Sequence, residues 1–220
     1  MTKAGGLKSL KDEYRWQIWL ILAFNSLFFY AITQENAIRF DGVRAAFTNA
    51  DNLLPVGFAL VAATVVNGLL SEQAKARVVF LRWRFPLPGH RAFSEHAQSD
   101  PRISLASLKS LCGPEWPTDP RDQNRIWYRM YKTVENEPAV RQVHRDFLLL
   151  RDYAGMSALF LLIYGAAGLY AIPSWKVGVC YAVLLASQFS VVRYSASNYG
   201  ISFVKTVLAV KAATHQIMPG

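Results

Sequence analysis

Charged side chains are absent from four long stretches of this 220-residue sequence, residues 16–32, 53–70, 154–172 and 177–192. Each stretch is near the ~20 residues that a helix needs to cross the hydrocarbon core of a bilayer. The stretches also lack the polar faces, repeating every 3.6 residues, that helices of a soluble bundle would show. Because no Asp, Glu, Lys, Arg or His lies inside a stretch, a proton-coupled pump or carrier is disfavoured. The missing charge therefore predicts four transmembrane helices.

Motifs of known catalytic geometry are also missing. The sequence has no Gly-rich phosphate loop, no Gly-x-Ser-x-Gly, no His-Glu-x-x-His and no paired cysteine knuckle. We therefore predict that the protein is not an enzyme and needs no cofactor.

Cysteine is scarce, and the two cysteines, Cys112 and Cys180, fall in a polar and an apolar segment. They are not expected to form a disulfide, because they would lie on different sides of the membrane surface. His90, His96, Cys112 and His144 have irregular spacing and come from separate segments. We predict ordinary core or surface positions for them and no metal site.

Basic residues are abundant and unevenly placed. Of the 24 Lys and Arg residues, 21 lie before the first stretch, between the second and third stretches, or after the fourth. Only Arg39, Arg44 and Lys176 lie in the other two connections. By the positive-inside rule, both termini and the long polar segment are predicted in the cytoplasm, with the protein in the cell inner membrane as a multi-pass protein.

These features predict an all-α membrane protein with four transmembrane helices. The helices form two hairpins, and a helical cytosolic domain is inserted between the second and third spans. The predicted parts are a cytosolic lead-in (1–14), a first hairpin (15–70), the cytosolic helical domain (71–152), a second hairpin (153–193) and a cytosolic amphipathic tail (194–220). Nothing interrupts the helical pattern from Ala139 to Gly155, so the last cytosolic helix is expected to continue into the third span.

The strongest candidate for a binding surface is the run Arg-Ile-Trp-Tyr-Arg-Met-Tyr-Lys at residues 125–132. Basic side chains can neutralise phosphates while aromatic rings stack on bases, which favours a nucleotide or oligonucleotide ligand. Alternatively, the aromatic residues are core anchors, the basic residues face anionic lipid, or the surface binds a cytosolic protein. The candidate ligand-binding residues are Arg125, Trp127, Arg129, Tyr131, Lys132, Arg141 and Arg145.

The amides Asn25, Asn67 and Gln188 lie within the apolar stretches. An amide in hydrocarbon needs a partner, so these side chains are expected either to bond between helices or to line an aqueous path. Small residues at 165–168 would allow another helix to approach closely. Together these features predict a homo-oligomer.

The order of two spans, a helical cytosolic domain and two further spans resembles the four-transmembrane effectors of bacterial antiviral defence systems. The resemblance is one of architecture over the whole chain, and no functional residue is carried over from it. It implies an oligomeric, channel-like membrane effector whose cytosolic domain senses a nucleotide, oligonucleotide or protein signal and alters membrane permeability. The alternative is a non-conducting membrane scaffold that recruits a cytosolic partner.

Overall fold

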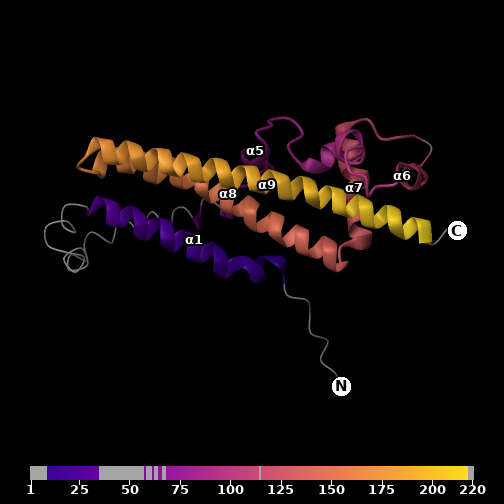
Figure 1. The fold of residues 1–220 in the computed structure, drawn as a ribbon, viewed down its shortest axis with the longest axis horizontal. Helices are drawn as coiled ribbons and strands as arrows, with labels where there is room; N and C mark the ends of the chain where they lie inside the picture. The colour runs from indigo at the N-terminus through magenta and orange to yellow at the C-terminus, as the bar shows by residue number, and fades with distance from the viewer. Residues whose placement is uncertain are drawn as a thin grey trace, which may run out of the picture. The chain divides into compact units, whose positions relative to one another are not determined.

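The computed structural model describes residues 9–34, 57, 61, 64–65, 68–113 and 115–217. Within this part of the chain all regular structure is helical, which confirms the predicted all-α class. The α-helices are α1 (Leu10–Thr33), α5 (Glu72–Phe80), α6 (Leu105–Cys112), α7 (Pro120–Val134), α8 (Pro138–Ala171) and α9 (Trp175–Ile217) (Figure 1). A 3-10 turn, η2 (Pro88–Arg91), and a π-helical turn, η3 (Ala92–His96), lie between α5 and α6.

Among the described residues, three helices are long and apolar enough to cross a membrane, namely α1, α8 and the 175–215 part of α9. They contain the first, third and fourth of the apolar stretches found in the sequence. The chain therefore has the character of a multi-pass membrane protein. The predicted second span, residues 53–70, lies mostly outside the described residues, and so does Asn67.

The chain forms two compact units. The apolar unit comprises Met1–Ser71 and Asp152–Val192, and the polar unit comprises Glu72–Arg151 and Arg193–Gly220. As expected, α8 is one helix from the polar segment into the third apolar stretch. The predicted amphipathic tail is not a separate helix, because α9 continues through Gly200 without a break.

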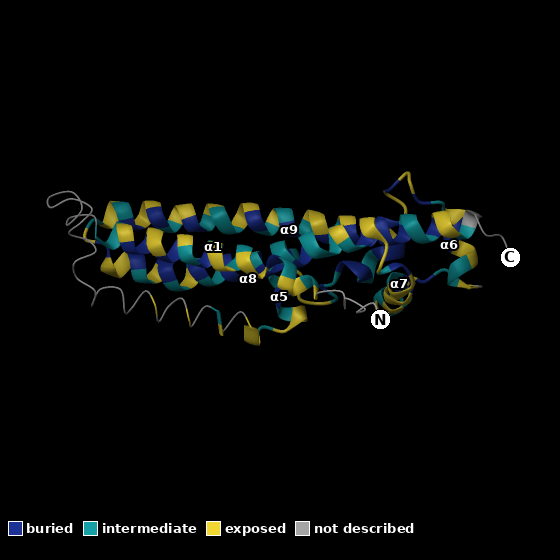
Figure 2. Ribbon diagram, turned by 90° about the horizontal axis from the view of Figure 1, so that it is seen from below, coloured by how far each residue is buried: buried dark blue, intermediate teal, exposed yellow. Residues whose placement is uncertain are grey.

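The apolar unit is a bundle of α1 with the 152–171 part of α8 and the 175–192 part of α9. Its core includes Leu22 and Phe29 from α1, Phe160 and Tyr164 from α8, and Tyr181 from α9. The rings of Phe29 and Tyr164 stack with their centroids 4.8 Å apart. The outer surface of the bundle is also apolar, and Figure 2 shows exposed residues along each of these helices. Such a surface suits hydrocarbon better than water.

Glycines bring α8 and α9 together in the apolar unit. A Cβ atom on Gly168 would lie 2.9 Å from a ring carbon of Tyr181, and one on Gly178 would lie 3.2 Å from the Gly168 carbonyl oxygen. At least part of the small-residue stretch 165–168 is therefore used inside the protomer. The homo-oligomer predicted from this stretch stays a prediction.

Several polar side chains of the apolar unit are paired within it. The Asn25 amide donates to the Ile21 carbonyl at 2.9 Å, and the Gln188 amide donates to the Tyr153 hydroxyl at 2.9 Å. The Tyr14 hydroxyl donates to Asp152 at 3.0 Å. Asn25 therefore bonds to its own helix, while Gln188 links α9 to α8. Each bond lowers the free-energy cost of keeping these polar groups away from water.

In the polar unit the connection between α5 and α6 is fixed by one buried glutamine. The Gln123 side-chain oxygen accepts from the backbone amides of Phe93 and Ser94, both at 3.1 Å, and its amide donates to the Thr118 carbonyl at 2.9 Å. Gln123 is only 1% exposed, so these bonds satisfy a side-chain amide that is shielded from water. The bonds attach η3 to the start of α7.

Candidate ligand-binding site

Helix α7 buries one stripe of its surface and leaves its basic residues outside that stripe. Asp119 caps the helix by accepting from the Arg121 backbone amide at 2.8 Å. The buried residues of α7 are Gln123, Trp127, Met130 and Val134, at steps of three and four. This spacing forms one inward stripe. Arg125, Arg129 and Lys132 are exposed outside it.

A cavity of about 420 Å³, here called the aromatic cavity, lies beside this stripe within the polar unit. Five of its lining residues come from the 138–151 part of α8 and from α9, and the others come from α5, α7, the η2 turn and the residue before that turn. Its lining residues are Glu72, Leu87, Pro88, Gly89, Asn124, Trp127, Tyr128, Tyr131, Lys132, His144, Phe147, Leu148, Arg151 and Phe203.

Phe203 is the centre of the ring packing around the aromatic cavity. Its ring stacks on His144 at 4.4 Å and makes edge contacts at 5.3 Å with both Trp127 and Tyr131. The Tyr131 hydroxyl and His144 Nδ1 lie within hydrogen-bond distance, at 3.2 Å. These contacts connect α7, α8 and α9 and set the orientation of each ring. The cavity therefore has stiff aromatic walls, which suit a flat ligand.

Gly89 closes one wall of the cavity by close approach. A Cβ atom there would lie 2.8 Å from a ring carbon of Trp127 and would also clash with the Asn124 side-chain oxygen. Only glycine lets the η2 backbone pack directly against the indole.

The polar groups of the cavity are partly neutral and partly charged. Burial, assisted by the Arg151 charge, lowers the pKa of His144 to about 4, so its imidazole is neutral at pH 7. Trp127 Nε1 is buried without an acceptor among the described residues. Lys132 pairs with Glu135 at 2.6 Å and Arg151 lies 3.7 Å from Glu72. With one acidic and two basic side chains in the lining, the cavity is weakly positive.

The residues predicted from the sequence to bind a ligand do not form one surface. Trp127, Tyr131 and Lys132 line the aromatic cavity together. Arg125 is exposed and pairs with Asp122 at 2.7 Å. On α8, Arg145 pairs with Asp146 at 3.0 Å and Arg141 is half-buried.

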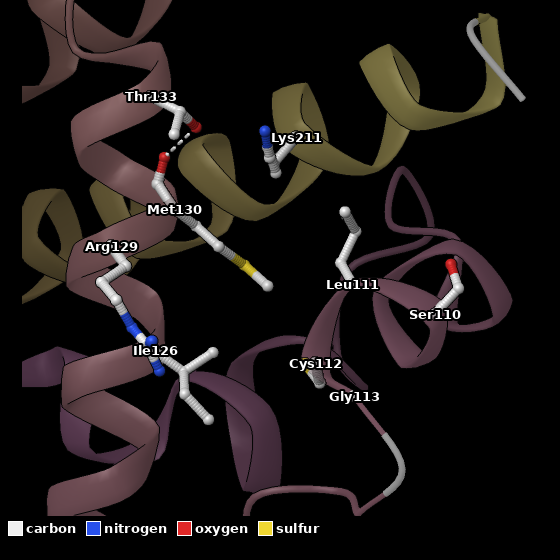
Figure 3. A pocket seen from close by; sticks show the side chains of 9 residues that line it. All are labelled: Ser110, Leu111, Cys112, Gly113, Ile126, Arg129, Met130, Thr133 and Lys211. Carbon is white, nitrogen blue, oxygen red and sulfur yellow. Dashed lines mark hydrogen bonds between the residues drawn. The ribbon is translucent and has the colours of Figure 1, made fainter. Parts of the chain in front are cut away.

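Arg129 instead lines a second hollow of about 400 Å³, here called the basic cavity. Figure 3 shows this hollow between α6, α7 and α9, with Leu111 and Met130 directed into it and with Lys211 on the α9 side. Cys112 also lines it, and burial raises the pKa of this thiol to about 11. The thiol is therefore protonated at neutral pH and is a poor nucleophile.

His144, Phe147 and Phe203 were not predicted as members of a binding site. Each is 12 or more residues from the 125–132 run, and only the packing of three helices brings them to one cavity. The described residues contain no group of three or more His, Cys, Asp or Glu that could hold a metal ion.

Comparisons of the chain with protein-family models, with curated proteins and with solved structures find no match. Function is therefore inferred from the site itself.

Proposed function

We propose that the protein is a membrane effector whose polar unit binds a planar, phosphate-bearing ligand in the aromatic cavity and thereby alters membrane permeability. One observation carries this proposal. The cavity is lined by His144, Phe147 and Arg151 of α8 and by Phe203 of α9. Both helices continue, without a break, into segments apolar enough to span a bilayer. A ligand that moves either helix in the polar unit acts on a membrane helix through rigid backbone.

In this proposal the chain has four membrane-spanning helices. Residues 53–70 supply the second span, in addition to those in α1, α8 and α9. Both termini and the polar unit lie in the cytoplasm of a bacterial cell, because 21 of the 24 basic residues are then on that side. The protein acts as a homo-oligomer, so that membrane helices from several copies surround a path for ions.

The ligand class follows from the cavity walls and their charge. Rings of Trp127, Tyr131 and Phe203 offer surfaces for a base, and the indole N–H of Trp127 offers a donor that no protein group uses among the described residues. Lys132 and Arg151 place positive charge in the lining for phosphate. A nucleotide or short oligonucleotide fits these features. The proposed role is binding, without catalysis.

The proposal is tested with the full chain in liposomes loaded with potassium ions. Nucleoside monophosphates, cyclic dinucleotides and tetranucleotide RNAs are added in turn, and potassium release is followed with an ion-selective electrode. Binding of the same compounds is measured by calorimetry in nanodiscs. At least one compound is expected to bind and to cause release.

Two variants leave the cavity walls nearly intact. Trp127→Phe removes the indole N–H, and Lys132→Gln removes the charge at the lining, so both are expected to weaken binding and release together. Arg125→Gln is the matched control, because Arg125 is on the same helix but outside the cavity. Binding without release under any condition would reject the effector in favour of a non-conducting scaffold. Absence of binding by every compound would reject the ligand class.

A further inference from the structure

An exposed aromatic and basic loop follows α5 in the polar unit. Residues 81–84, Leu-Arg-Trp-Arg, are four consecutive exposed residues. Leu81 is 63% exposed and Trp83 is 82% exposed. A tryptophan gains more than most side chains from leaving water, so an indole this exposed points to a contact outside the polar unit.

The fold fixes this loop with its apolar side chains outward. Leu81 and Phe85 both have φ of 51°, in the left-handed region that bulky residues avoid. The Phe85 ring is held by the Arg121 guanidinium 5.8 Å above it and by His90 at 5.4 Å. Pro86, which follows, is buried. The strained turns at each end thus hold Trp83 in the exposed position.

The charge around Trp83 has one sign. Arg77, Arg82 and Arg84 are exposed, and no acidic residue occurs from position 73 to position 94. A hollow of about 240 Å³ lies between Arg77, Val78, Leu81, Arg82 and Trp83. The surface therefore combines apolar side chains, a small hollow and three arginines.

We infer that residues 81–84 are a membrane-surface anchor that binds anionic phospholipid. Trp83 and Leu81 lie at the boundary of the acyl chains, and the arginines contact headgroup phosphates. Tryptophan and arginine are the residues that favour this layer, and anionic lipid complements the charge of the loop. Only Ser71 and α5 separate the loop from the predicted span 53–70, so the chain tethers it close to a bilayer. This inference does not depend on the ligand of the aromatic cavity.

A nitroxide spin label measures the depth of the loop in the full chain. Cys112 and Cys180 are first replaced by alanine, and a single cysteine is introduced by Trp83→Cys. Asn136→Cys is the matched control, since Asn136 is an exposed residue of the polar unit between α7 and α8. Both proteins are placed in nanodiscs of phosphatidylglycerol with phosphatidylcholine. Collisions of the label with oxygen, which concentrates in lipid, and with a water-soluble nickel complex are then measured.

The label at position 83 is expected to collide more with oxygen and less with nickel than the label at position 136. In nanodiscs of phosphatidylcholine alone this difference should shrink, because the charge attraction is lost. Arg82→Glu with Arg84→Glu should abolish it, while Lys109→Glu with Arg125→Glu should leave it unchanged. Equal accessibility at 83 and 136 would overturn the inference. Protection of position 83 from both reagents would also overturn it, because that result indicates a protein contact.

Discussion

The two units of this protein differ in where they place aromatic and aliphatic side chains. In the polar unit a cluster of large rings packs inside, around Phe203, which is 4% exposed, while Trp83 is an exposed exception. In the apolar unit the outer surface carries Phe24, Leu162 and Tyr170, which are 68%, 69% and 95% exposed. Exposure of an apolar side chain therefore has different energetic consequences in the two units. Exposing apolar surface to water costs free energy, so the polar unit buries that surface. In hydrocarbon the apolar unit exposes apolar side chains without this cost.

Helix α8 shows the same contrast within one element. Its first part carries Arg141, Arg145 and Asp146, while no charged residue follows Asp152. The backbone is continuous, so the change from a polar to an apolar surface comes from side chains alone. A single helix is thus suited to two solvents, which is what the proposed transmission of a signal requires.

The largest predicted effect is the loss of the central ring of the polar unit. Phe203→Ala removes contacts to Trp127, Tyr131 and His144 and is expected to lower the free energy of unfolding by about 3–5 kcal/mol. Denaturant unfolding in mild detergent, followed by tryptophan fluorescence, measures this change.

Leu162→Ala is the matched control in the apolar unit. Leu162 is 69% exposed, so its truncation should cost well under about 1 kcal/mol in the same detergent. Equal losses for the two variants would break the comparison between the units, because they would place Leu162 in a packed interface as well.

The second prediction concerns pH, and it separates the units because all four histidines belong to the polar unit. Burial lowers the pKa of both His96 and His144 from 6.5 to about 4. Between pH 6.5 and pH 4 the unfolded chain binds protons that the folded chain does not, so stability falls as the pH falls. Each histidine contributes a loss of roughly 3 kcal/mol at most, complete near pH 4. Asp100 titrates below this window, because its bond to Arg102 lowers its pKa to about 2.

Substitution of each histidine tests whether its protonation causes the loss of stability at low pH. His144→Gln is expected to remove part of the stability loss between pH 6.5 and pH 4, and His96→Gln to remove a similar part. Denaturant unfolding curves at several pH values give the slope of the free energy of unfolding against pH. An unchanged slope in both variants would show that other groups cause the acid sensitivity.

Much of the fold follows from local sequence signals. The continuity of α8 was predictable because no helix-breaking residue lies between Ala139 and Gly155, and the start of α7 because Asp119 and Pro120 form a cap. The uninterrupted α9 was not predicted, because residues 194–220 were assigned to a separate tail. That tail contains Gly200. Its Cβ position lies 2.7 Å from Phe80 and 2.8 Å from Phe147, so this glycine permits close helix packing and does not end the helix.

The candidate site was only partly predictable. Trp127 and Tyr131 were identified by residue type and spacing. Arg129 was included with them as a candidate, although it lies about 200° from Trp127 around a helix. Arg129 consequently lines the basic cavity. Phe203 and His144 come from helices whose order in space no local pattern specifies. Tertiary packing alone brings them together.

The smallest predicted effect compares one polar contact in each unit. In the apolar unit the Tyr14 hydroxyl donates to the Asp152 carboxylate at 3.0 Å, and both residues are buried. Tyr14→Phe keeps the ring and removes this bond to a charged acceptor, so it should lower the free energy of unfolding by about 1–3 kcal/mol. In the polar unit Arg125→Gln breaks the pair with Asp122, whose side chains are 68% and 49% exposed. Water already screens that pair, so its loss should cost no more than about 0.5 kcal/mol.

Both variants are compared with the unmodified chain by denaturant unfolding in the same detergent, at pH 7 and at low and high salt. The Tyr14→Phe loss should be insensitive to salt, because the bond is shielded from solvent, whereas any Arg125→Gln loss should vanish at high salt. A Tyr14→Phe variant as stable as the unmodified chain would mean that water reaches Asp152 and replaces the hydroxyl. Asp152 would then belong to a hydrated surface, and the change from polar to apolar surroundings along α8 would begin after it.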